Sequence, residues 1–274
     1  MVHHQCDTVR VAIVGLGAIG KVLARKLADG GIPGMTLAAV SARNVEKART
    51  FLSELSPDTP IVPFDRLPEV ADVVVECAPA ALLADIAKPV LEQGKKLMVL
   101  SVGALLDKSE LVALAHRTGG QIIVPTGALL GLDAVSAAAE GKINSVSMIT
   151  RKPVKGLLGA PYLEKNHIRL DGITKPVKVF EGTAREAANG FPANLNVAAA
   201  LSLAGIGADR TKQEIWADPT ITRNTHVIKV DSDSAHLEMK IENIPSENPK
   251  TGRITALSVI AALRKMTGPL RVST

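Results

Sequence analysis

Short runs of apolar residues and amphipathic segments alternate through the first half of the chain. The apolar runs have the length of strands buried on both faces, and they occupy residues 9–14, 37–40, 73–75, 96–101 and 121–125. The segments between them repeat apolar residues with a helical period, as at positions 45, 48, 51, 52 and 55. Repeated strand–helix units predict an α/β domain with a Rossmann-type, doubly wound parallel sheet.

Several of these helices begin or end at residues with capping chemistry. Asn44 has a side chain suited to accept from the free N–H groups of a first helical turn. Asp107, followed by Glu110, has the spacing of a capping box. The helix that begins at Ala81 is expected to end at Gly94.

Beyond about residue 131 the pattern changes to alternation of polar and apolar residues. Alternation is typical of strands with one wet face in a mostly antiparallel sheet, and it occurs at 145–151, 177–181, 225–230 and 235–242. A final helix is expected to start at Asn248-Pro249, to end before Gly268-Pro269, and to present an apolar side made of Ile254, Leu257, Ile260 and Ala261. We therefore predict a first domain at 1–130, a second α+β domain at 131–245, and a C-terminal helix within 246–274 that returns to the first.

Composition narrows the class of protein. Of 274 residues, 46% are hydrophobic but only 2% are aromatic, so the core must be built from aliphatic side chains. The net charge of +5 is spread along the chain without a dense basic block, which argues against nucleic acid as a partner. No apolar stretch has the length of a membrane span, and no signal-peptide core is found. With only Cys6 and Cys77, we expect no structural disulfide and a cytoplasmic location.

The first predicted strand runs directly into a Gly-x-Gly-x-x-Gly pattern. In this pattern the first glycine takes a tight turn, the second lets the backbone approach a phosphate, and the third lets the helix pack on the strand. The free N–H groups at the start of the helix then face the anion. Because a strand precedes the pattern and an amphipathic helix follows it, we predict a nucleotide pyrophosphate site at Gly15, Gly17, Ala18, Ile19 and Gly20.

Other short loops follow the predicted strands of the same sheet. Ligands of an open α/β sheet bind beyond the carboxyl ends of its strands. The candidate loops are 41–43, 77–80 with Cys77, Ala78 and Pro79, 101–103, and 126–131. Each could equally be an ordinary tight turn.

The loop at 41–43 bears on the choice of cofactor. About 20 residues after the glycine loop, NAD-selective proteins carry an acidic residue that binds the ribose 2′-hydroxyl. This chain has Ser41 and Arg43 instead, so nothing repels a 2′-phosphate and two groups could bind one. Arg43 could also be a solvated residue, and both NAD and NADP therefore remain open.

Six histidines are candidates for acid–base chemistry. Four lie in places without promising neighbours, namely His3, His4, His116 and His236. His226 shares strand parity with Ile228 and Val230, so it is expected to point toward the buried side. Parity alone fits a core histidine as well as a catalytic one, and His167 stays undecided.

Three more polar side chains suit an anionic ligand. Asn194 and Asn196 stand before an Ala-rich helix, where either could cap the helix or present an amide to a ligand. Lys152 ends a predicted strand and could bind a substrate carboxylate, although most surface lysines bind nothing. No cluster of Cys and His has the spacing of a metal site, so we expect no metal.

Together these motifs resemble those of the L-aspartate dehydrogenase family over nearly the whole chain. The matching stretches are the glycine loop and residues 75–79, 126–131, 150–153, 191–197, 218–219, 223–226 and 248–251. The glycine loop is general to dehydrogenases, whereas the later stretches in this order are specific. The resemblance implies a homodimer that oxidises L-aspartate with NAD(P)+ to iminoaspartate, which hydrolyses to oxaloacetate and ammonia or feeds quinolinate and NAD synthesis.

The resemblance also implies roles for particular residues. His226 is then the catalytic residue, Ala128 lies at the nicotinamide end of the cofactor site, and Asn194 or Asn196 contacts the cofactor. Residues 1–130 become the dinucleotide-binding domain and 131–245 the catalytic and dimerisation domain. A histidine with a pKa near neutrality suits the proton transfers that accompany imine formation and hydrolysis.

Two other classes of protein share parts of this pattern. A two-domain reductase of the dihydrodipicolinate or homoserine dehydrogenase type is the enzymatic alternative, but the paired histidines and lysine typical of the former are not found. A nucleotide-sensing regulatory protein with a Rossmann domain and no chemistry is the non-enzymatic alternative. Reduction of NAD+ or NADP+ in the presence of L-aspartate separates the three.

Overall fold

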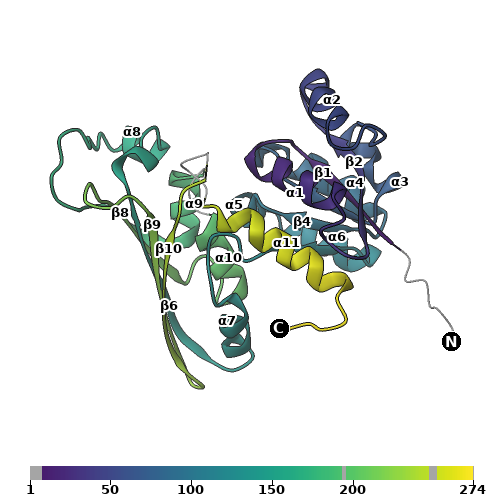
Figure 1. Ribbon diagram of the computed structural model, residues 1–274. Coiled ribbons are helices and arrows are strands. Elements are labelled where there is room, and N and C mark those ends of the chain that lie inside the picture. Colours follow the sequence, from purple (N-terminus) through teal and green to yellow (C-terminus); the bar gives the residue numbers. More distant parts are fainter. Residues whose placement is uncertain (1–7, 193–195, 247–251, 274) are drawn as a thin grey trace. The chain divides into compact units, whose positions relative to one another are not determined.

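The chain forms two units, each built on its own five-stranded sheet (Figure 1). The computed structural model describes residues 8–192, 196–246 and 252–273. The first unit contains 8–101, 107–125 and 256–272, and the second contains 102–106 and the described part of 126–255. Asn194 and the predicted helix start at Asn248-Pro249 lie outside the described residues.

The first sheet is parallel throughout. Its strands are β1 (Val9–Val14), β2 (Met35–Ser41), β3 (Val73–Glu76), β4 (Lys96–Val99) and β5 (Gln121–Ile123). Their spatial order is β2-β1-β3-β4-β5, so the chain leaves β1 toward one edge for β2 and crosses back to the other side for β3. This arrangement confirms the predicted doubly wound, Rossmann-type sheet, and its topological switch point lies between β1 and β3.

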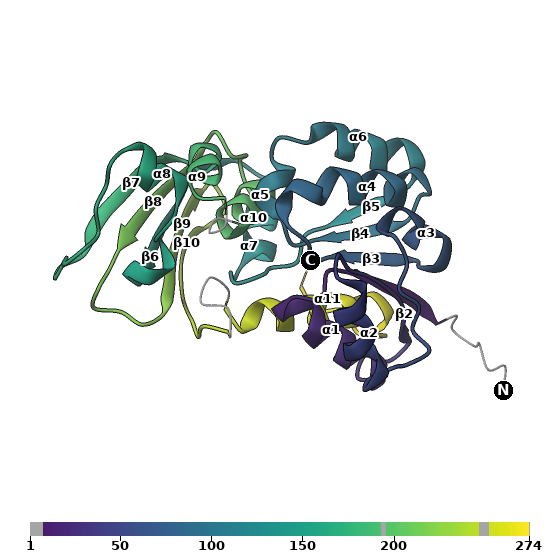
Figure 2. The same cartoon turned by 90° about the horizontal axis from the view of Figure 1, so that it is seen from above.

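Helices cover both faces of this sheet (Figure 2). They are α1 (Ala18–Ala28), α2 (Val45–Ser53), α3 (Leu67–Val70), α4 (Leu83–Glu92), α6 (Ser109–Thr118) and α11 (Ile254–Thr267), with short 3-10 turns at Phe64–Arg66 and Ala80–Leu82. One buried cluster joins Ile13 of β1 to Leu23 of α1 and to Val259 and Leu263 of α11. The C-terminal helix is therefore part of the core of the first unit.

The predicted caps have different outcomes. The Asn44 side chain accepts from the backbone N–H of Lys47 at 2.9 Å, which confirms the cap of α2. The capping box predicted at Asp107 is wrong, because α6 begins one residue later and has Lys108 as its N-cap. A capping box does occur at the start of α9 (Ala184–Gly190), formed by Thr183 and Glu186.

The predicted apolar side of the last helix is wrong except at Ile260, which is partly buried and packs against the core of the first unit. Ile254 and Leu257 are 40% and 59% exposed, whereas Ala256, Val259 and Leu263 are the buried residues of α11. Both sets of residues recur with a helical period, so the pattern alone does not distinguish them. Val259 and Leu263 belong to the buried cluster that contains Ile13 of β1 and Leu23 of α1, and this packing decides which side is buried.

The second sheet is mixed. Its strands are β6 (Ile143–Lys152), β7 (Val177–Thr183), β8 (Thr211–Ala217), β9 (Asn224–Ser232) and β10 (His236–Asn243). Their order is β10-β9-β6-β8-β7, and every neighbouring pair is antiparallel except β6 and β8. The sheet confirms the predicted mostly antiparallel architecture, although the pattern did not predict β8.

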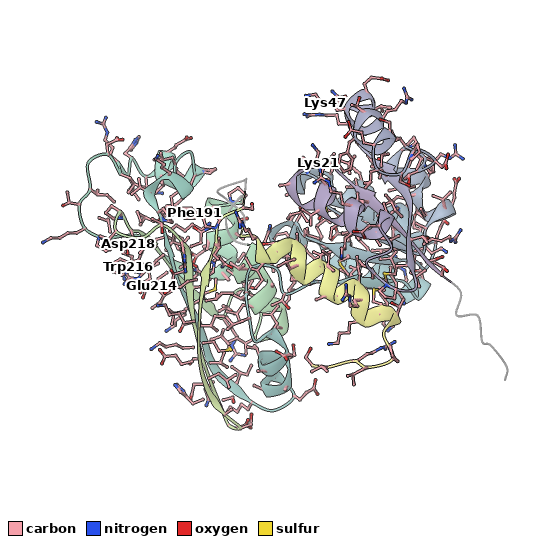
Figure 3. The ribbon with its side chains drawn as sticks, viewed as in Figure 1. Lys21, Lys47, Phe191, Glu214, Trp216 and Asp218 are labelled. Carbon is pink, nitrogen blue, oxygen red and sulfur yellow. The ribbon has the colours of Figure 1, made fainter. Side chains whose placement is uncertain are left out.

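Helices pack on one face of the second sheet. The unit contains α5 (Val102–Leu105), α7 (Leu132–Ala139), α8 (Pro161–Lys165), α9 and α10 (Asn196–Ala204), with a 3-10 turn at Val154–Gly156. Met148 of β6 and Ile228 of β9 belong to one buried cluster with Leu201 of α10. Glu214 and Trp216 of β8 lie on the opposite face, away from these helices (Figure 3).

Candidate functional site

The glycine loop joins β1 to α1 in a geometry that only small residues permit. Gly15 has a φ of +92°, and its N–H donates to the carbonyl of Ser41 at 2.7 Å. A Cβ on Gly20 would lie 2.0 Å from the carbonyl oxygen of Gly15, so the helix packs directly on the turn. The left-handed turn and this close approach explain why the first and third glycines stand here.

The second glycine of the loop faces open space. Gly17 is the N-cap of α1, makes no side-chain cap, and would meet nothing within 4 Å if it carried a Cβ. Ala18 and Ile19 follow in the first turn of α1, whose N–H groups have no intrahelical acceptor. This uncapped helix start with an open approach fits a dinucleotide pyrophosphate.

The end of β2 carries hydroxyl and guanidinium groups and no carboxylate. Ser41 is buried and Arg43 is exposed, and Asn44 next to them is engaged in the cap of α2. Lys21 of α1 and Lys47 of α2 come from the helices that follow β1 and β2 (Figure 3). The charge at this edge of the sheet is therefore positive.

A buried carboxylate ties the ends of β3 and β4 together. Glu76 is fully buried and accepts from the N–H groups of Ala78, Leu100 and Ser101 at 2.8, 3.2 and 2.9 Å, and from the Ser101 hydroxyl at 3.0 Å. Burial raises the pKa of Glu76, and the hydrogen bonds from Ser101, Ala78 and Leu100 oppose that rise. Glu76 thus orders two of the loops at which a ligand was predicted, a role that the sequence pattern did not reveal.

The loop after β3 also touches the glycine loop. A Cβ on Gly15 would lie 2.7 Å from the carbonyl oxygen of Cys77. The Cys77 thiol takes part in no disulfide among the described residues. Ala78 is half-buried and Pro79 is exposed. The structure therefore brings Gly15, Cys77 and Ala78 together at the switch point of the sheet.

In the second unit, His226 lies where strand parity predicted it. It is 3% exposed, sits in β9, and is in register with Thr150 of β6. Its Nδ1 lies 3.0 Å from the Thr150 hydroxyl. Burial, and then the charge of Lys152, lower the pKa of His226 to about 3, well below the near-neutral value that suits proton transfer.

Lys152 is not the surface residue that its position at a strand end suggested. It is 3% exposed and belongs to the same side of β6 as Thr150, two residues earlier. Thr150 is the register partner of His226, so Lys152 follows that partner by one step along the same face of β6, and its charge lowers the pKa of His226. A buried cation next to a neutral hydrogen-bonding ring is a suitable site for a carboxylate ligand.

Two further predicted residues are held by backbone contacts in this unit. The side-chain oxygen of Asn196 accepts from the N–H of Gly103 at 3.0 Å. The carbonyl of Ala128 accepts from the side chain of Asn243 at 2.9 Å. Asn196 therefore has a structural role that does not require a ligand, and Asn243 is an unpredicted residue that fixes the loop containing Ala128.

Over 8–192, 196–246 and 252–273, no three His, Cys, Asp or Glu side chains are grouped so that they could hold a metal ion. In the same part of the chain, no helix is long and apolar enough to cross a membrane.

Comparisons with known protein families match both halves of the chain. The family described as "Aspartate dehydrogenase, C-terminal" matches residues 133–266. The family described as "Homoserine dehydrogenase, NAD binding domain" matches residues 15–125. The second match includes the glycine loop, and the first includes His226 and Lys152.

Individual relatives match nearly the full chain. An L-aspartate dehydrogenase from Bordetella bronchiseptica is 60% identical and covers 98% of each chain. One from Bradyrhizobium diazoefficiens is 59% identical over 97% of this chain and 94% of its own. The crystal structure of aspartate dehydrogenase from Thermotoga maritima has a TM-score of 0.73 and 25% identity, and covers 97% of this chain and 99% of its own.

Proposed function

Because the chain belongs to the L-aspartate dehydrogenase family, we propose that it oxidises L-aspartate with NAD+ or NADP+. The structural observation that carries the proposal is the buried pair of Lys152 and His226 within the region that matches the aspartate dehydrogenase C-terminal domain. A cation and a hydrogen-bonding ring suit a dicarboxylate substrate. The uncapped start of α1 supports the dinucleotide part of the proposal.

The proposed reaction assigns a task to each group of residues. When bound, the nicotinamide supplies the acceptor for the hydride that leaves the α-carbon of aspartate. Gly15, Gly17 and Gly20, with Ala18 and Ile19, hold the pyrophosphate. The loops containing Ser41, Arg43, Cys77, Ala78, Pro79, Ala128, Asn194 and Asn196 line the rest of the cofactor. Lys152 holds a carboxylate, and His226 is the group that exchanges or shares a proton with the reacting substrate.

The product of the first step is iminoaspartate. Loss of hydride from the α-carbon and loss of a proton from the amine together form its C=N bond. Addition of water and departure of ammonia then give oxaloacetate. Release before hydrolysis would instead provide the imine for quinolinate formation and hence for NAD synthesis.

The activity is tested by mixing the purified protein with L-aspartate and NAD+ or NADP+. We expect the absorbance of the reduced nicotinamide to increase with time only when L-aspartate is present. Homoserine serves as the competing substrate, because the NAD-binding half of the chain matches a homoserine dehydrogenase domain. Reduction of the cofactor with homoserine but not with L-aspartate would overturn the substrate assignment. Binding of the nucleotide without its reduction in the presence of either substrate would favour a sensing protein.

Arg43 is proposed to bind the 2′-phosphate of NADP. Its exposed guanidinium follows β2, where no carboxylate repels a phosphate. We expect Arg43→Ala to lower kcat/KM with NADP+ about tenfold or more, because charge-assisted hydrogen bonds are lost, and to leave kcat/KM with NAD+ nearly unchanged. Arg49→Ala is the matched control, since Arg49 is exposed on α2 and paired with Glu46. Equal losses with both cofactors would contradict the phosphate role.

We also propose that the enzyme is a homodimer, as its family resemblance implies. The face of the second sheet away from the helices carries Trp216, Ile149 and Val227, which are all partly exposed. Apolar side chains on a sheet face support its use as an interface. Sedimentation is expected to give twice the chain mass of 28.7 kDa, and Trp216→Glu is expected to shift the protein toward the monomer. A wild-type protein that sediments as a monomer at micromolar concentration would contradict the proposal.

A further inference from the structure

Three side chains on adjacent strands form a buried hydrogen-bond chain that ends on His226. The amide nitrogen of Gln213, on β8, donates to the hydroxyl oxygen of Thr150 at 3.1 Å. That hydroxyl lies 3.0 Å from Nδ1 of His226 on β9. Gln213 and Thr150 are fully buried, and His226 is 3% exposed, so water does not compete for these contacts.

The orientation of the Gln213 amide is fixed by a second contact. Its nitrogen also donates to the backbone carbonyl of Glu214 at 2.6 Å. Turning the amide over would place two carbonyl oxygens at that distance, where they repel each other. The present orientation leaves the Gln213 side-chain oxygen without a partner among the described residues, which costs less than an oxygen–oxygen contact. Gln213 therefore approaches Thr150 as a donor.

The hydroxyl of Thr150 then has one direction for its hydrogen. A hydroxyl has a single hydrogen and two acceptor sites, and one acceptor site is taken by Gln213. Within the described part of the chain, Nδ1 of His226 is the acceptor in reach of the hydrogen. If Nδ1 carried a proton, both acceptor sites of the hydroxyl would be filled and its hydrogen would be buried without a partner. The contacts thus favour an unprotonated Nδ1.

The surroundings of the ring keep it neutral. Lys152, on β6, is the charged group that acts on the imidazole, while Thr150 on β6 and Ile241 on β10 lie beside it without charge. The α10 helix, which packs on this face of the sheet, has no titratable side chain. Burial and the Lys152 charge lower the pKa of His226 to about 3. The single ring proton of the neutral form is then on Nε2.

We propose that Thr150 and Gln213 are positioning residues that hold His226 as the neutral tautomer with its proton on Nε2. The inference rests on the proposed function for its catalytic meaning. In this tautomer His226 meets the substrate as a hydrogen-bond donor, suited to an oxygen of a carboxylate or of the water-addition product of the imine. To accept a proton at Nε2, the ring must first carry a proton on Nδ1, and the Thr150 hydroxyl must turn away from it.

Nitrogen-15 NMR of the histidine side chains reads the tautomer directly in the substrate-free protein. The His226 signal is assigned by its absence in His226→Ala. We expect a pyrrole-like Nε2 and a pyridine-like Nδ1, with an excess of this form of about tenfold or more and no titration from about pH 5 to about pH 9. A protonated Nδ1 in the wild-type protein would overturn the proposal, whether or not the protein oxidises aspartate.

Variants test the two positioning residues separately. Thr150→Val removes the hydroxyl at nearly constant volume, and we expect mixed tautomers and a roughly tenfold lower kcat with little change in the KM of the cofactor. Thr150→Ser keeps the hydroxyl and should show the wild-type tautomer of His226 and the wild-type kcat. Gln213→Leu frees an acceptor site on Thr150 and should raise the fraction with a proton on Nδ1.

A matched control separates this role from a general loss of packing. Thr211 is also fully buried on the same side of the sheet, and its hydroxyl donates to the backbone carbonyl of Gly207 at 2.9 Å. Thr211→Val should lower stability while leaving the tautomer and the pH profile of kcat as in the wild type. The proposal is refuted if both Thr150→Val and Gln213→Leu keep the wild-type tautomer and the wild-type kcat. If Thr150→Val fails to fold, the tautomer in Gln213→Leu and in the wild-type protein decides whether the proposal holds.

Discussion

Replacing His226 with alanine is expected to lower kcat for L-aspartate oxidation by about 100-fold or more. The imidazole is the ring beside Lys152 on the buried side of β9, and alanine has no group to share or exchange a proton with the substrate. The KM for the cofactor should change little, because the proposed pyrophosphate contacts come from the glycine loop. Steady-state rates with saturating cofactor, together with the cofactor Kd from reduced-nicotinamide fluorescence, measure the two effects separately.

A second histidine provides the control. His116 lies in the last turn of α6 in the first unit and is exposed, so His116→Ala removes the same side chain from a solvent-facing position outside the second sheet. We expect wild-type kcat for that variant. Thermal unfolding must show that His226→Ala is folded, because its loss leaves the Thr150 hydroxyl without an acceptor. A folded His226→Ala protein with near wild-type kcat would remove His226 from the mechanism.

The sequence predicts the parts of this fold that depend on local geometry. The glycine loop, the Asn44 cap and the burial of His226 each follow from residues close together in the chain, where backbone conformation and strand parity decide the outcome. The α11 helix shows the limit of such reasoning. Its two sides are both apolar, and only packing against distant residues determines that Val259, and not Leu257, is buried.

The partners of His226 mark the same limit within the candidate site. Thr150 and Gln213 are 76 and 13 residues from His226 in the sequence, and their contact depends on the order and register of β8, β6 and β9. Strand β8 was not predicted because its inward residues include Thr211 and Gln213, which break the apolar alternation. The inward polar residues that complete this buried network are therefore also the reason that the sequence pattern does not predict β8.

Two glycine-to-alanine substitutions in the glycine loop are expected to affect different properties, one the stability of the first unit and the other the binding of the cofactor. Gly20→Ala places a Cβ 2.0 Å from the carbonyl oxygen of Gly15, a backbone contact that cannot be relieved by moving a side chain. We expect a loss of about 3 kcal/mol in the free energy of unfolding of the first unit. Calorimetry should show its thermal transition about 10 °C lower.

Gly17→Ala adds the same methyl group at a position where nothing lies within 4 Å, and Gly17 has a φ of −75° that alanine readily adopts. Its thermal transition should therefore match the wild type. The Kd for NAD+ and NADP+ should rise about tenfold or more, because the methyl group occupies the space through which the backbone approaches the pyrophosphate. Wild-type affinity for both cofactors in Gly17→Ala would contradict the proposed pyrophosphate site. If the phosphates bind at this uncapped helix start, the added methyl group must obstruct them.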